Sequence, residues 1–359
     1  MSHLARFGWT PRLDEAFGPY RAQGMIPARV AVEHRSVYVL YAESGELTAT
    51  LAGRLRHAAE EGADGGDLPA VGDWVAVALP PGEGRAMVRA VLPRSSKFAR
   101  KVAGRTTEEQ VVAANVDVVF VVTAAGGDVN PRRLERYLAL AWESGATPAV
   151  VVSKADVDPD PAETTRLVSG VALGVAVHRV SSVTGEGLDE IRAYLREGRT
   201  VALIGSSGVG KSTLVNALLG EERQPTAEVR EDGRGRHTTT RRELLALPAG
   251  GLLLDTPGMR ELQLWDAAAG VAGTFEDVAA LAAACRFVDC RHESEPGCAV
   301  LAAVDAGRLD PERLESFRKL RAELEYLDAR RDEAARAAAK REARVADRAL
   351  HSRLSEKYK

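Results

Sequence analysis

The octet GSSGVGKS at residues 205–212 constrains the fold more than any other stretch of the sequence. It matches G-x-x-x-x-G-K-[ST] and lies between an apolar run, TVALIG, and a helix-forming run, STLVNALLG, that ends at Gly220. A strand, a glycine-rich loop and a helix in this order place backbone N–H groups and the positive helix end around a polyphosphate. The octet therefore predicts a phosphate-binding loop, or P-loop.

The chain around the octet alternates in the same way from Val116 to Leu264. Apolar runs such as VDVVFVVTA and PAVVVSKAD are separated by helix-forming stretches such as PRRLERYLALAWESG. Apolar strands that alternate with helices are typical of a parallel sheet covered on both faces. We therefore expect an α/β domain with a doubly wound sheet.

Three further motifs follow predicted strands of this domain. In DTPG, Asp255 can hold magnesium through water and the amide of Gly258 can approach a γ-phosphate. In SKAD, Asp156 can accept hydrogen bonds from both guanine N–H donors, while Lys154 lies along the base. The stretch VSSVTGEG at 180–187 suits a loop whose backbone contacts the guanine oxygen, with a plain turn as the alternative. Because ligands bind at the carboxyl ends of such strands, the motifs together predict one GTP site.

The order of these motifs is unusual. The guanine-binding loops precede the P-loop, and DTPG comes last, which is a circular permutation of the common GTPase order. Domain termini often lie close together, so a sheet tolerates being opened at another point. The permutation brings DTPG close in sequence to the C-terminal segment, and we expect the nucleotide state to act on that segment.

Short β-rich runs between Ile26 and Leu92, separated by turn residues, predict a five-stranded oligonucleotide-binding (OB) barrel. No acidic residue occurs from Arg85 to Arg105, a stretch that suits contact with RNA phosphates, although a solubilising surface is the alternative. The basic residues of this stretch are Arg85, Arg89, Arg94, Lys97, Arg100, Lys101 and Arg105.

All three cysteines lie in one short window, CRFVDCRHESEPGC, as Cys285, Cys290 and Cys298 with His292 between them. Three thiolates and one imidazole form a closed tetrahedral set suited to one structural zinc ion. A disulfide interpretation leaves one cysteine over. The chain has no apolar run of signal-peptide or bilayer-spanning length, so we expect a cytoplasmic protein without membrane contact. Its formal net charge of only -3 does not by itself indicate a nucleic-acid partner. Nothing in the sequence suggests an obligate dimer, so we expect a monomer.

The motifs VGDWV, SKAD, GSSGVGKST, GRGRHTTT and DTPGMRE, with the Cys/His cluster, resemble the RsgA family over nearly the whole chain. These are circularly permuted GTPases dependent on the small ribosomal subunit. The resemblance implies binding of the small (30S) subunit and its rRNA, and GTP hydrolysis coupled to late subunit maturation, with low basal activity that the subunit stimulates. It implies an N-terminal extension (1–25), an OB-fold RNA-binding barrel (26–100), a permuted GTPase domain (101–265) and a helical zinc-binding module with a basic tail (266–359).

Met259 follows the DTPG glycine, and a thioether cannot orient a water molecule for hydrolysis. The resemblance implies that His237 does so, and that a nearby threonine, for which we choose Thr239, binds magnesium with Ser212 and Asp255. Lys211 completes the catalytic set. The expected GTP/GDP-binding residues are Ser153, Lys154, Ala155, Asp156, Ser181, Ser182, Gly205, Ser206, Ser207, Gly208, Val209, Gly210, Lys211, Ser212, Thr213, Asp255 and Gly258.

Two other functions remain open on the sequence. A nucleotide-gated RNA-binding scaffold with vestigial hydrolysis is compatible with Met259. An ATP-driven enzyme is disfavoured by Asp156, whose carboxylate suits guanine.

Overall fold

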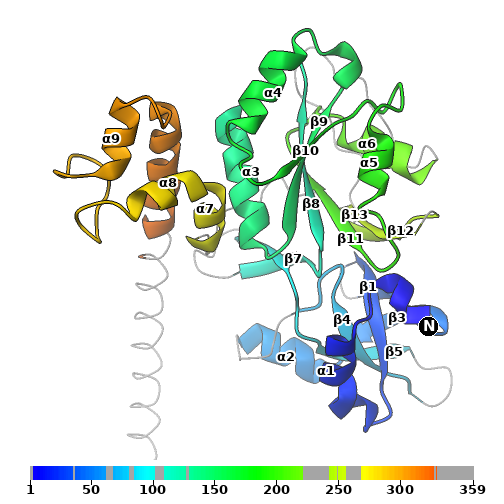
Figure 1. Ribbon diagram of the computed structural model, residues 1–359. Coiled ribbons are helices and arrows are strands. Elements are labelled where there is room, and N and C mark those ends of the chain that lie inside the picture. Colours follow the sequence, from blue (N-terminus) through cyan, green and yellow to red (C-terminus); the bar gives the residue numbers. More distant parts are fainter. Residues whose placement is uncertain are drawn as a thin grey trace, which may run out of the picture.

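The computed structural model describes residues 3–34, 37–61, 68–80, 85–101, 109–126, 129–220, 242–248, 250–255, 268–326 and 329. Figure 1 shows three parts: a small barrel near the N-terminus, an α/β sheet above it, and a group of helices beside the sheet. Within the described residues, no helix has both the length and the apolar character that crossing a bilayer requires.

The N-terminal part is a closed five-stranded barrel, as the short β-rich runs predicted. The strand order is β1-β2-β3-β5-β4, and a pairing of β4 with β1 closes the barrel. Alternate side chains fill the interior, among them Val30, Tyr38, Leu40, Val75 and Val88. The strands are β1 (Ile26–His34), β2 (Val37–Ala42), β3 (Gly45–Leu51), β4 (Trp74–Ala78) and β5 (Ala86–Val91), and helix α2 (Gly53–Glu61) follows β3.

The residues before the barrel fold against it as a short helix, η1 (His3–Phe7), and helix α1 (Pro11–Arg21). The buried side chain of Arg29 fastens this segment. It donates to the carbonyls of Phe7, Gly72 (3.1 Å) and Asn115 (2.9 Å), which belong to the extension, the barrel and the start of the α/β domain. Burial lowers the pKa of Arg29 to about 10, so the side chain stays charged at neutral pH.

A two-stranded ribbon, β6 (Lys97–Lys101) with β7 (Glu109–Ala114), connects the barrel to the α/β domain. Members of the predicted basic stretch have structural partners here, among them Arg94 and also Arg100, which donates to the side-chain oxygen of Gln110 at 3.1 Å. Arg94 forms two 2.8 Å hydrogen bonds to the carboxylate of Asp73, whose side chain is fully buried. Arg94 therefore belongs to the packing of the barrel, whereas Arg85, Arg89 and Lys97 are exposed.

The α/β domain has the sheet order β10-β9-β8-β11-β13-β12, parallel except for β12. Helices α3 and α4 cover one face and α5 and α6 the other (Figure 1). Along β8, Val119 and Val121 face the first pair and Phe120 and Val122 the second, which explains the continuous apolar run. The bounds are β8 (Val118–Ala124), α3 (Pro131–Glu143), β9 (Thr147–Ser153), η2 (Ala155–Val157), α4 (Pro161–Ser169), β10 (Ala176–Arg179), α5 (Leu188–Arg192), β11 (Thr200–Ile204), α6 (Lys211–Leu219), β12 (Arg242–Ala246) and β13 (Leu252–Asp255).

The C-terminal helices pack against α3. Gly270 allows the closest approach, because a Cβ there would lie 2.3 Å from the carbonyl oxygen of Ala139. A buried ionic cluster joins the two parts: the fully buried carboxylate of Glu135 accepts from Arg132 (2.9 Å) and Arg313 (3.1 Å). The described elements are α7 (Ala268–Thr274), α8 (Glu276–Ala282), α9 (Ala299–Asp305) and a helix over 311–326.

Candidate nucleotide site and metal centre

The predicted P-loop connects the carboxyl end of β11 to the start of α6. Gly205, Gly208 and Gly210 all have positive φ, at 147°, 80° and 84°. A Cβ at Gly205 would lie 2.3 Å from the carbonyl oxygen of Val122, so only glycine fits there. Val209 turns its side chain into the core, which fixes the loop to the sheet. The loop thus has the sharp turn and the helix start that phosphate binding requires.

Lys211 lies at the first position of α6 and curls back over the loop. Its ammonium donates to the carbonyl oxygens of Gly205 (2.8 Å) and Ser206. Its charge is thereby held at the mouth of the loop, where a phosphate oxygen would compete for the same protons. Ser212 and Thr213 follow in the first turn of α6.

Ser153, at the end of β9, has a role that the sequence did not reveal. Its buried hydroxyl lies 2.6 Å from the carbonyl oxygen of Val209 and 3.2 Å from that of Thr123. A hydroxyl has one proton to donate, and the shorter distance indicates that Ser153 donates it to the carbonyl of Val209 in the P-loop. Ser153 therefore joins the SKAD loop to the P-loop.

The rest of SKAD leaves the sheet in a fixed conformation. Lys154 has a φ of 58°, in the left-handed region, and a short helix, η2, follows. The amide of Ala155 donates to the carbonyl of Val180 at 3.1 Å, which ties SKAD to the adjoining 180–187 loop. Asp156 is exposed, with a carboxylate accessible to a ligand.

The 180–187 loop is a compact turn organised by Ser181. The buried hydroxyl of Ser181 accepts from the amides of Val183 (3.2 Å) and Thr184 (3.1 Å). The Ser181 side chain thus shapes the loop whose backbone is expected to contact guanine, and Ser182 is half-buried. Gly187 is required because a Cβ there would lie 2.0 Å from the carbonyl of Arg179.

Arg179 and Asp158 form an ion pair of 2.7 Å at the base of SKAD and the 180–187 loop. Burial works to raise the pKa of Asp158, but hydrogen bonds from Arg179 and Thr164 outweigh it and hold that pKa below its usual value. Asp158 and Arg179 are remote from each other in the sequence, and no motif indicates the pair.

The P-loop follows β11, SKAD follows β9, and the 180–187 loop follows β10. Because these strands are parallel, the three loops lie at one edge of the sheet. Strand β13 ends at Asp255 on the same sheet. His237, Thr239, Gly258 and Met259 lie outside the described residues, as does the side chain of Asp255, so their assigned roles stay predictions.

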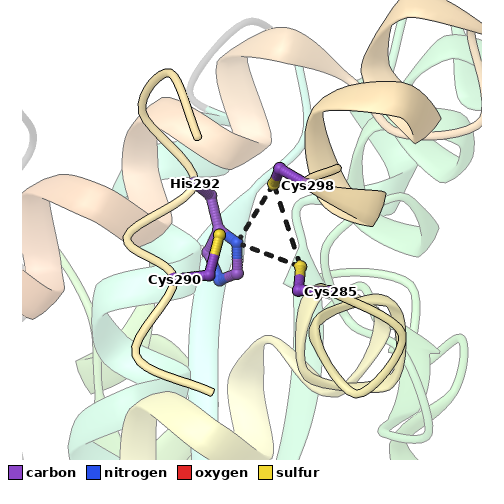
Figure 2. Close-up of side chains that lie close together, drawn as sticks. All are labelled: Cys285, Cys290, His292 and Cys298. Atoms are coloured by element: carbon purple, nitrogen blue, oxygen red, sulfur yellow. Dashed lines mark hydrogen bonds between the residues drawn. The ribbon is translucent and has the colours of Figure 1, made fainter. Parts of the chain in front are cut away.

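The Cys/His cluster comes together as expected. Cys285 follows α8, Cys298 caps α9, and the loop between them supplies Cys290 and His292, as Figure 2 shows. The Nδ1 atom of His292 lies 3.6 Å from the sulfur of Cys285 and 3.4 Å from that of Cys298, and these two sulfurs are 3.8 Å apart.

These separations fit a tetrahedral metal site. With Zn–S of about 2.3 Å and Zn–N of about 2.0 Å, ligand atoms around zinc lie about 3.5–3.8 Å apart. All four ligand atoms lie within 4.8 Å of one another. Burial lowers the pKa of His292, with help from the positive charges of Arg321 and Arg318, so the imidazole is neutral and its nitrogen can bind a metal.

Glu295 organises the ligand loop and was not identified from the sequence. Its carboxylate accepts from the backbone amides of Arg291 (2.7 Å), Glu293 (2.8 Å) and Ser294 (3.0 Å). These hydrogen bonds stabilise the charged form and lower the pKa of Glu295 to about 2. The only signal in the sequence is an acidic residue inside a tight ligand-bearing turn.

Comparison with known proteins agrees with this architecture. The RsgA GTPase family matches residues 91–265. The small ribosomal subunit biogenesis GTPase RsgA of Opitutus terrae is 50% identical over 339 residues, covering 92% of each chain. That of Streptomyces coelicolor is 47% identical over 345 residues, covering 95% of this chain and 92% of its own.

Two solved structures share the fold. YjeQ from Thermotoga maritima is 27% identical, with a TM-score of 0.62 over 84% of this chain and 98% of its own. YloQ, described as a circularly permuted GTPase, is 22% identical, with a TM-score of 0.59 over 84% of this chain and 95% of its own. With the permuted sheet, the N-terminal barrel and the Cys/His cluster in place, the chain belongs to the RsgA family of circularly permuted GTPases, which are GTP hydrolases.

Proposed function

We propose that this protein binds the small ribosomal subunit in the cytoplasm and couples GTP hydrolysis to late maturation of that subunit. The observation that carries the proposal is the contact of Ser153 with the carbonyl of Val209, which joins a guanine loop and a P-loop into one site. Relatives that match over 92% or more of this chain bear the name small ribosomal subunit biogenesis GTPase.

The chemistry of GTP binding follows from the loops. The P-loop amides and Lys211 would hold the phosphates, and Asp156 would accept from the N–H groups of guanine. The magnesium ligands would be Ser212, Thr239 and, through water, Asp255. Magnesium neutralises charge on the phosphates when it is bound.

The proposed contact with ribosomal RNA uses the barrel and its flanking strand. Arg85 directly precedes β5, Arg89 lies on β5, and Lys97 lies on β6. All three side chains are exposed, so they can pair with phosphates. The formal net charge of the whole chain is only -3, so such contacts would be local. We propose that the protein binds ribosomal RNA as a monomer.

The Cys/His cluster would hold one zinc ion as a structural element. Its four protein ligands leave no position for a water molecule, so a catalytic zinc is not expected. Zinc would fix the loop between α8 and α9. The ionic cluster at Glu135 joins the C-terminal helices to α3.

A scaffold with vestigial hydrolysis is the second candidate, because Met259 occupies the position where Ras-like GTPases carry a water-orienting glutamine. Replacing His237 with alanine distinguishes the two. If His237 orients the attacking water, subunit-stimulated phosphate release should fall by about 10²-fold or more, while GTP affinity stays unchanged. His237→Gln is the matched variant: its amide can orient water, and it should retain part of the stimulated rate. Equal stimulated rates in wild type and His237→Ala would contradict the catalytic role.

A further inference from the structure

Strand β1 connects the barrel strands with those of the α/β domain in one continuous sheet. Its first half closes the barrel, with Ile26 to Arg29 paired to β4. Its last residues pair instead with β12 of the α/β domain, through Val32 with Glu243 and Glu33 with Arg242. The pairing of β1 with β2 shifts register between Val30 and Val32, and such a bulge bends a strand where it changes partner.

Two side-chain contacts reinforce the seam between β1 and β12. Glu33 and Arg242 form an ion pair of 3.5 Å whose side chains are only 24% and 17% exposed. Tyr41, on β2, donates its hydroxyl to the carbonyl of Leu244 on β12 at 3.1 Å. The ring of Tyr41 stacks on Phe7 of the N-terminal extension, with centroids 4.6 Å apart, which limits its movement.

On β12, the seam lies next in sequence to residues assigned to hydrolysis. Glu243 pairs with Val32 on one side and with Asp255 on the other. Asp255 begins the DTPG motif, and Arg242 directly follows the segment that contains His237 and Thr239. The barrel therefore holds the hairpin of β12 and β13 at the end from which both of these segments leave.

We propose that this seam transmits binding of the ribosomal subunit from the barrel to the site of hydrolysis, with Glu33, Arg242 and Tyr41 as positioning residues. A partner that fixes the barrel also fixes the end of the β12–β13 hairpin, where the segments that contain His237, Thr239 and DTPG are joined to the sheet. The inference rests on the proposed function, because it concerns how the subunit stimulates hydrolysis. The new element is that the effect of subunit binding reaches the site of hydrolysis through the barrel.

The test uses the double variant Tyr41→Phe/Glu33→Gln, which removes the hydroxyl contact and the ion pair but leaves strand pairing possible. The matched control is Tyr20→Phe/Glu15→Gln, since both residues lie on α1 and neither belongs to the seam. Phosphate release from GTP is measured with and without purified small subunits, and subunit affinity is measured by sedimentation with a non-hydrolysable GTP analogue.

We expect the seam variant to lose about 3- to 30-fold of the stimulation, with basal rate and subunit affinity unchanged. The control variant should resemble wild type. Exchanging the charges, as Glu33→Arg/Arg242→Glu, should restore more stimulation than either single change retains. Full stimulation in the seam variant, or a loss that follows reduced subunit affinity, would overturn the coupling alone. A wild-type protein without stimulation would overturn the proposed function and the coupling with it.

Discussion

Replacing Asp156 with asparagine should weaken GTP binding by about 10²- to 10⁴-fold. The carboxylate is expected to accept two hydrogen bonds from guanine, and hydrogen bonds to a charged group contribute about 1.5–3 kcal/mol each. Asparagine keeps one acceptor oxygen but presents an N–H group where guanine also has an N–H group. Calorimetry should show that the free energy of GTP binding becomes less favourable by the corresponding amount.

Xanthosine triphosphate provides the matching gain. Xanthine carries a carbonyl where guanine carries an amino group, so the amide of the Asp156→Asn variant can donate to it. The variant should prefer xanthosine over guanosine triphosphate, and the wild type should show the reverse preference. Asp160→Asn is the control: Asp160 caps α4 through the amide of Glu163, and asparagine caps equally well. An Asp156→Asn protein that keeps full GTP affinity would show that SKAD does not bind the base.

Removing the metal, or replacing Cys298 with serine, should unfold the loop between α8 and α9. Structural zinc contributes about 10–16 kcal/mol of apparent binding free energy in small zinc domains, and here the four ligands connect the end of α8 to the start of α9. Cys298 is also the N-cap of α9, where its sulfur accepts from the amide of Leu301 at 3.4 Å. Residues 285–305 should therefore lose protection against amide hydrogen exchange.

The nucleotide site should tolerate this loss. The P-loop and guanine loops are held by β9, β11 and Ser153, so GDP affinity should remain. Ser294→Ala, within the same loop but not a ligand, should keep its metal and its exchange protection. A wild-type protein that contains no zinc, or a Cys298→Ser variant with unchanged exchange, would contradict the structural role.

Local patterns in the sequence were sufficient for the barrel, the permuted sheet and the Cys/His cluster. The P-loop has fixed spacing, and Cys285 to Cys298 lie within one turn-rich window, so neighbours in sequence are also neighbours in space. The positive φ of Gly205, Gly208 and Gly210 bears out the glycine pattern.

Contacts between distant segments could not be predicted in this way. Ser153 is remote from Val209 in the sequence, and nothing in SKAD indicates that its hydroxyl serves the P-loop. Arg94 belonged to a basic stretch that suggested RNA contact, but a buried carboxylate at Asp73 pairs with it. Tyr41 contacts Leu244 only because β1 leaves the barrel to pair with β12. Such contacts depend on strand order, which the local pattern does not specify.

The most direct test of the central claim is phosphate release from GTP and from ATP, each with and without purified small ribosomal subunits. Release from GTP alone should be slow, subunits should stimulate it strongly, and they should not stimulate release from ATP. Slow release from GTP that subunits leave unchanged would contradict the claim and would favour a binding scaffold, while equal stimulation with ATP would contradict the guanine site at Asp156.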